Sequence, residues 1–313
     1  MNTTKPYRIT RERPFFATIG VITLCLVVGL YLHSSRSVLA TDNNFADGIT
    51  VDSTGDGADA NLGDSICDDG TGNCTLRAAI EESNQEAGTQ TIRFNITGTT
   101  DFTNGGQNGY SIKPNLALPN ITSTTIIDGY SQPGAAVNTA VAPEPLDGRL
   151  LIELDGASVS TPGVSGIEIS GAPDVVVKGL VIGGWSSAGI RVNGDSAKIE
   201  GNYIGTDYSG SAANGNEGNG VEGWGDGADS VYIGGLLPAA RNLISGNPGA
   251  GMGLGPNHDN WTIQGNYIGI ASDGITALPN AQPGGSGNPS LDYVTGTLVG
   301  GPRCWSRKCN LRE

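Results

Sequence analysis

Basic residues are scarce in this sequence, and they are not clustered. The 313 residues include 17 Lys and Arg against 31 Asp and Glu, a formal net charge of −14. Residues 1–40 carry five of the basic residues and one of the acidic ones, so the remainder keeps 12 and 30, a net charge near −18. Binding to a phosphate backbone needs grouped Lys and Arg, and the sequence therefore excludes nucleic acid as a partner.

Aromatic residues (6%) and charged residues (15%) are also scarce, and helical periodicity is nearly missing. Glycine, by contrast, occurs 50 times, often at the ends of short Val- and Ile-rich runs. This composition is too apolar and too punctuated for a disordered acidic chain, and it predicts an all-β fold.

The first 40 residues have the organisation of an export signal. Several basic residues precede an apolar run over residues 15–32, and "SVLA" follows, ending at Ala40. This pattern predicts a signal peptide over residues 1–40 that is cleaved before Thr41. Since the run is long enough to span a bilayer, an uncleaved anchor is the alternative, and it would be the chain's one membrane contact. Either way, we expect a secreted or cell-surface protein.

A short unit recurs in the second half of the chain. "AKIEGNYIGTD" (Ala197 to Asp207) returns 64 residues later as "WTIQGNYIGIA" (Trp261 to Ala271). Weaker copies are "VVVKGLVIGG" from Val175, "SVYIGG" from Ser230 and "RNLISGN" from Arg241. Apolar residues alternate within each copy, so the repeats predict a solenoid built of strands.

The spacing of the copies predicts a three-sided parallel β-helix. Val175 and Ala197 are 22 residues apart, about one turn, and the next two steps are about 32. "TIIDG" (125–129) and "IELDG" (152–156), 27 apart across a Pro- and Ala-rich excursion, extend the pacing upstream. The longer steps predict loops inserted at one corner, the clearest being residues 205–219, and stacked insertions commonly form a binding face. Asn202 and Asn266 recur at one register and predict a stacked ladder.

A short helix is expected before the repeats. Residues 49–51 ("ITV") predict a strand, and Thr75 opens a helix in which Leu76, Ala79, Ile80 and Ser83 share an apolar face. Arg77 and Glu81 are spaced for an exposed ion pair. Such a helix is suited to cover the open end of a β-solenoid, over residues 41–90.

Cys67 and Cys74 bracket a six-residue acidic loop. An exported protein can oxidise this pair, and no His lies nearby to complete a zinc site. We therefore expect a disulfide, with two free thiols as the alternative.

"CTLRAAIEESN" (Cys74 to Asn84) resembles the CSLREA motif of exported bacterial proteins, with Thr75 in place of Ser and Ala78 in place of Glu. In that family the motif precedes a right-handed parallel β-helix. The resemblance extends over nearly all of residues 49–301 and implies export and this fold. It implies no catalytic residues, because the family is defined by its architecture.

The segment before the helix is rich in aspartate: Asp52, Asp56, Asp59, Asp64, Asp68 and Asp69. Such a loop can supply the oxygen ligands that calcium needs. However, neither EF-hand spacing nor a Gly-rich nonapeptide repeat is present, and a solvated turn is the simpler interpretation. Calcium is therefore the one cofactor considered, and no metal site is certain.

Residues for catalysis are few. Beyond residue 40 the sequence has one His, His258, which with Asp259 and with Glu222 is the only candidate for acid–base chemistry. Asp207 and Asp273 look alike, but the 64-residue shift places Ala271 opposite Asp207, so they predict no ladder. Glu200 becomes Gln264 in the second copy. We therefore expect no catalytic set.

Residues 302–313 break the repeat. "GTLVGG" (296–301) matches "SVYIGG", but a basic tail with Cys304 and Cys309 stands where a copy of "NLISGN" is expected. With suitable codons, reading one base later restores "NVISGN", and our hypothesis is a frameshift in a longer gene. The alternative is a genuine tail with a second disulfide.

Together these patterns predict a signal (1–40), a cap (41–90), a right-handed parallel β-helix (91–301) and an aberrant tail (302–313). The leading function is a non-catalytic scaffold that binds polysaccharide or a cell-surface glycan. A pectinase-like lyase or hydrolase, or the remnant of a larger surface protein, are the alternatives.

Overall fold

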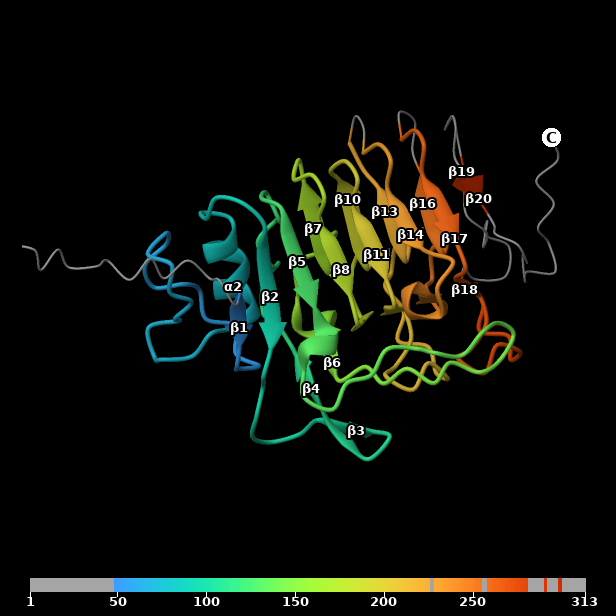
Figure 1. Cartoon of the computed structure of the whole chain (residues 1–313), viewed down its shortest axis with the longest axis horizontal. Helices are drawn as coiled ribbons and strands as arrows, with labels where there is room; N and C mark the ends of the chain where they lie inside the picture. The colour runs from blue at the N-terminus through green and yellow to red at the C-terminus, as the bar shows by residue number, and fades with distance from the viewer. Residues whose placement is uncertain (1–47, 226–227, 255–257, 281–289, 292–297, 300–313) are drawn as a thin grey trace, which may run out of the picture. The chain divides into compact units, whose positions relative to one another are not determined.

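The computed structural model describes residues 48–225, 228–254, 258–280, 290–291 and 298–299. The predicted signal (1–40) and the aberrant tail (302–313) lie outside the described residues. The described residues form mostly short strands in parallel sheets, which confirms the all-β class (Figure 1). Within these ranges, no helix combines the length and the apolarity that crossing a membrane requires.

Three sheets share the strands. The eight-stranded sheet has the order β1 (Ile49–Val51), β2 (Gln90–Phe94), β5 (Thr125–Asp128), β8 (Val176–Lys178), β11 (Lys198–Glu200), β14 (Tyr232–Gly234), β17 (Thr262–Gln264) and β20 (Leu298–Val299). The five-stranded sheet has β7 (Ile167–Ser170), β10 (Ile190–Asn193), β13 (Val221–Gly223), β16 (Met252–Leu254) and β19 (Ser290–Leu291). The seven-stranded sheet has β3 (Phe102–Asn104), β4 (Gln107–Ile112), β6 (Ile152–Asp155), β9 (Leu180–Gly183), β12 (Tyr203–Ile204), β15 (Leu243–Ile244) and β18 (Tyr267–Ile268).

From β8 onward the chain visits the three sheets in a fixed order. β8, β9 and β10 lie in the eight-, seven- and five-stranded sheets, and β11, β12 and β13 repeat that order. Each strand pairs in parallel with the strand three positions later, whereas β3 and β4 pair antiparallel. The sequence repeat therefore corresponds to one strand in each of three sheets.

The registers agree with the predicted spacing where no loop intervenes. Val177 pairs with Ile199, 22 residues on, as predicted. The two longer steps are unequal, since Lys198 pairs with Tyr232 and Tyr232 with Thr262, steps of 34 and 30. Thr262 also pairs with Leu298, which confirms the predicted match of "GTLVGG" with "SVYIGG".

One part of the predicted pacing is wrong. "TIIDG" lies on β5 in the eight-stranded sheet, but "IELDG" lies on β6 in the seven-stranded sheet, so the two are not successive copies. Their likeness has a local cause. Asp128 caps the 3-10 helix η1 (Gly129–Ser131), and Asp155 caps η2 (Gly156–Ser158), each by accepting a backbone N–H two residues on.

The alternating apolar residues face a common core. Ile127, Val177, Ile199, Ile233 and Ile263 follow one another across the eight-stranded sheet, and all are buried in one cluster with their counterparts from the other two sheets. Burial of one row from each sheet explains why a unit with a single apolar face needs its neighbours.

The Asn ladder is present, with a member that the prediction missed. Asn242 lies between Asn202 and Asn266: its Oδ1 accepts the backbone N–H of Asn202 at 2.9 Å, and its own N–H donates to Asn266 Oδ1 at 3.1 Å. The amide of Asn202 donates to Val177 O, and that of Asn242 to Ile199 O. The ladder therefore satisfies backbone groups where the chain turns between two sheets.

A second ladder, formed by Asn216, Asn247 and Asn280, lies at the next corner. Asn247 Oδ1 accepts the N–H of Asn216 at 3.2 Å, and Asn280 Oδ1 accepts the N–H of Asn247 at 3.1 Å. All three side chains are buried. Two of the corners are thus held by the same chemistry.

The predicted helix is α2 (Leu76–Ser83), with Thr75 as N-cap. Leu76, Ala79 and Ile80 are buried in the core cluster with β1 and β2, as expected of an apolar face. The predicted pair of Arg77 with Glu81 is wrong. Arg77 instead forms an ion pair with Asp56 at 2.7 Å, and Glu81 accepts the N–H of Asp59, because the preceding loop folds over the helix.

The Pro- and Ala-rich excursion forms a strap, defined here as residues 136–149, whose ends pair at Ala136 and Arg149. Ala142 and Leu146 of the strap pack against a second apolar cluster on the seven-stranded sheet, formed by Leu150, Val181, Tyr203, Leu243 and Tyr267. The inward residues of the same strands, such as Ile182 and Ile204, belong to the main core. This sheet is therefore apolar on both faces.

Polar contacts fix the strap to three successive strands or their loops. Arg241 donates to Ala140 O at 2.8 Å, Tyr267 Oη donates to Glu144 O at 2.8 Å, and Leu146 N–H donates to Ser272 O at 2.8 Å. In Figure 1 the green strap accordingly runs beside the orange C-terminal strands.

Replacing Asn242 with Ala should lower the free energy of unfolding by about 2–4 kcal/mol, since it leaves buried backbone groups of both neighbouring turns without partners. Asn108→Ala, at an exposed position of β4, should cost about 0.5 kcal/mol or less. Urea denaturation measures both. Equal midpoints for the two variants would mean that the ladder does not hold the corner.

Replacing Arg241 with Ala should loosen the strap, because its guanidinium donates to Ala140 O and lies 4.8 Å above the ring of Tyr267. Thermolysin should cut within residues 136–149 about fivefold to tenfold faster. Arg93→Ala, exposed on β2, is the matched control and should leave the cleavage rate unchanged.

Candidate functional site

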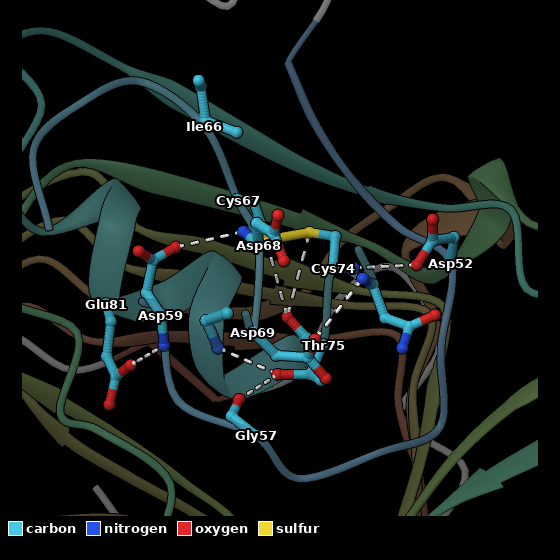
Figure 2. Close-up of a disulfide and its surroundings, with 12 residues drawn as sticks. Asp52, Gly57, Asp59, Ile66, Cys67, Asp68, Asp69, Cys74, Thr75 and Glu81 are labelled. Carbon is cyan, nitrogen blue, oxygen red and sulfur yellow. Dashed lines mark hydrogen bonds between the residues drawn. A yellow bond between two sulfur atoms is a disulfide. The ribbon is translucent and has the colours of Figure 1, made fainter. Parts of the chain in front are cut away.

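The acidic loop before α2 is closed by the predicted disulfide between Cys67 and Cys74, which is present with an Sγ–Sγ distance of 2.02 Å (Figure 2). Asp52 accepts the backbone N–H of Cys74 at 2.9 Å, and Asp68 accepts those of Gly70 and Gly72. These carboxylates therefore cap turns of their own loop.

The other aspartates are used in the same way. Asp59 accepts the N–H of Asn61, Asp64 that of Ile66, and Asp56 binds Arg77. Hydrogen bonds to Asp69, the Thr71 hydroxyl first, hold its pKa below the ordinary value. In the described part of the chain, no three His, Cys, Asp or Glu side chains form a group that could hold a metal ion. The calcium hypothesis thus gains no convergent set of ligands.

Glu82 of α2 explains why this loop lies over the helix. Its buried carboxylate accepts the N–H groups of Gly63 and Ser65 at 2.7 and 2.6 Å. Burial raises the pKa of Glu82 above its ordinary value, although the two hydrogen bonds oppose that shift. Glu82 is therefore a structural carboxylate.

The residues considered for catalysis are not brought together as a solvent-facing set. His258 is 1% exposed and lies edge-on to Trp261, and a Cβ at Gly223 would come within 2.7 Å of its Cδ2. The backbone N–H of Asp259 donates to Asp229 Oδ1 at 2.9 Å. A histidine enclosed in this way has no direct access to a polymeric substrate.

The inserted loop over residues 205–219 is ordered by its own contacts. Thr206 pairs with Ala213, and Asp207 accepts the N–H groups of Ser211 and Ala212. In the second copy, Asp273 accepts the N–H groups of Ile275 and Thr276. Asp207 and Asp273 each hold their own loop, in agreement with the prediction that they form no ladder.

At the end of this loop lies a charged row on the five-stranded sheet. Glu168 on β7, Arg191 on β10 and Glu222 on β13 occupy one register. Arg191 Nε donates to Glu222 Oε2 at 3.1 Å, and its Nη1 lies 3.5 Å from Glu168 Oε2. The neighbouring residues of these strands face the core, so the row lies on the opposite face.

Polar and aromatic groups surround the row. Ser187 Oγ accepts from Arg191 Nη2 at 2.9 Å, and Asn219, the last residue of the inserted loop, donates to Glu222 Oε1 at 3.2 Å. The ring of Trp224, directly after β13, lies with its centroid 4.5 Å from Arg191 Cζ. Trp224 is 52% exposed, whereas Trp185 and Trp261 are fully buried.

Sequence reasoning named Glu222 and the loop up to Asn219 but missed Glu168, Arg191 and Trp224. A signal was available. "GIE" at Gly166, "GIR" at Gly189 and "GVE" at Gly220 have the same frame, in which a charged residue follows an inward apolar one. Strand pairing of these three frames predicts the row.

No protein-family model matches the chain, and no curated protein matches it significantly. The resemblance to the CSLREA-motif proteins stays a prediction. A function is therefore inferred from the chemistry of the site, which combines a fixed aromatic ring, two carboxylates and amide and hydroxyl groups on one face. This combination is suited to binding a polyhydroxylated ligand.

Arg191→Ala should lower the free energy of unfolding by about 1–3 kcal/mol, because Glu168 and Glu222 lose the cation that joins them. Arg191→Lys should cost less, since the charge remains but its fork of donors is lost. Urea denataturation of both variants, with and without Glu222→Gln, gives the coupling energy. A coupling near zero would show that the row contributes nothing to the fold.

Proposed function

We propose that the chain is an exported or cell-surface scaffold that binds glycans without cleaving them. In this proposal the three sheets close into a right-handed parallel β-helix over residues 91–301, capped by residues 41–90. The regular order of strands among the sheets and the general right-handedness of parallel crossovers support this fold. The basic, apolar N-terminal pattern and the disulfide support export.

The observation that carries the proposal is the row of Glu168, Arg191 and Glu222. Three stacked strands hold these side chains at one register, so their separations follow from the sheet itself and need no induced order. Preorganised polar groups on a rigid surface reduce the entropic cost of binding.

The second candidate is a glycoside hydrolase, and one geometric feature favours it. Glu168 and Glu222 are two strand spacings apart, about 9–10 Å between backbones, close to the carboxylate separation of inverting enzymes. Arg191 lies between them and binds both carboxylates. Because the attacking water would have to lie in that space, binding without cleavage is the better supported function.

The purified full-length chain should be retained on immobilised polysaccharide without releasing new reducing ends, with or without calcium. Neutral and acidic polysaccharides are both to be tested, and chain ends are to be counted in the same samples. New ends that vanish in Glu222→Gln would replace the scaffold with the hydrolase. Failure of every polysaccharide to retain the chain would contradict glycan binding.

A further inference from the structure

The exposed indole of Trp224 is held in place by its neighbours. Arg191 covers one face of the ring, with Cζ 4.5 Å from the centroid, and the backbone N–H of Trp224 donates to Val192 O at 2.9 Å. Yet Trp224 remains 52% exposed. A fixed, partly open aromatic ring presents a flat apolar surface without further loss of side-chain entropy on binding.

The groups beside the ring accept hydrogen bonds more readily than they donate them. All three nitrogens of the Arg191 guanidinium already have partners, namely Glu222, Glu168 and Ser187. No edge of the guanidinium is left for the two-point grip with which arginine binds a ligand carboxylate. The glutamates, in contrast, have further lone pairs, since each carboxylate has about four acceptor sites.

The charge of the site acts in the same direction. Two carboxylates and one guanidinium leave the row with a net negative charge, on a chain whose formal net charge is −14. A ligand carboxylate or sulfate placed there would be repelled, whereas a hydroxyl group would find acceptors.

We infer that Trp224, Arg191, Glu168 and Glu222 form a subsite for a pyranose glycan without acidic groups. The C–H face of the sugar stacks on the open part of the Trp224 ring, and its hydroxyl groups donate to the two glutamates. This inference rests on the proposed glycan binding and adds where the sugar binds and which class of sugar it is.

The test uses the full-length chain and two soluble probes of equal length, a neutral gluco-oligosaccharide and an oligogalacturonate. Dissociation constants are measured by calorimetry for the native chain and for Trp224→Ala, Trp224→Phe and Tyr232→Ala. Tyr232 is a matched control, because it is an aromatic residue, 41% exposed, on the eight-stranded sheet.

We expect the neutral probe to bind and the acidic probe to bind at least about tenfold more weakly. Trp224→Ala should weaken the neutral probe by about tenfold or more, Trp224→Phe should restore part of the loss, and Tyr232→Ala should change it by less than about twofold.

Three results would overturn the inference. If the acidic probe binds as tightly as the neutral one and depends on Trp224, the sugar class is wrong. If binding is the same in Trp224→Ala, the glycan binds elsewhere, and the proposed scaffold function survives without this subsite. If neither probe, nor any polysaccharide, binds the native chain, the proposed function itself fails.

Discussion

The structure depends on satisfying backbone groups where the chain turns from one sheet to the next. Within a sheet, parallel pairing supplies partners for the backbone, but a corner has no such ladder. Buried asparagines supply it: Asn242 bridges the turns above and below, and Asn247 does so at the next corner. Because each amide must meet the next, the stacking of corners also fixes the register of the strands. The registered rows of side chains on the sheets follow from that constraint.

The same stacking gives the sheets different outer faces. On the seven-stranded sheet the outer residues are apolar, and the strap covers them, with Leu146 packed on the cluster that contains Tyr203 and Leu243. On the five-stranded sheet the outer residues are charged, and Trp224 remains exposed beside them. One sheet is thus closed by the chain itself, whereas another presents ordered polar groups to a ligand.

Much of the fold could be predicted from the sequence because its causes are local and repeated. Alternation gave the strands, and "GNYIG" gave the registers of Asn202 and Asn266. Asn242 was missed because it lies 40 residues after Asn202 and 24 before Asn266, so loop insertions hide its period. The partner of Arg77 was missed for a different reason, since Asp56 reaches it from a loop whose path no periodicity encodes.

The candidate site was harder to predict, because its residues belong together only after three strands have been paired. Arg191 looks like any outward residue until Glu168 and Glu222 are placed on either side. The most direct test of this account is a crystal structure of the full-length chain with a neutral gluco-oligosaccharide. The account predicts a continuous right-handed coil with a sugar ring on Trp224 and its hydroxyl groups at the two glutamates. Sheets that do not close, or a sugar ordered on another face, would contradict it.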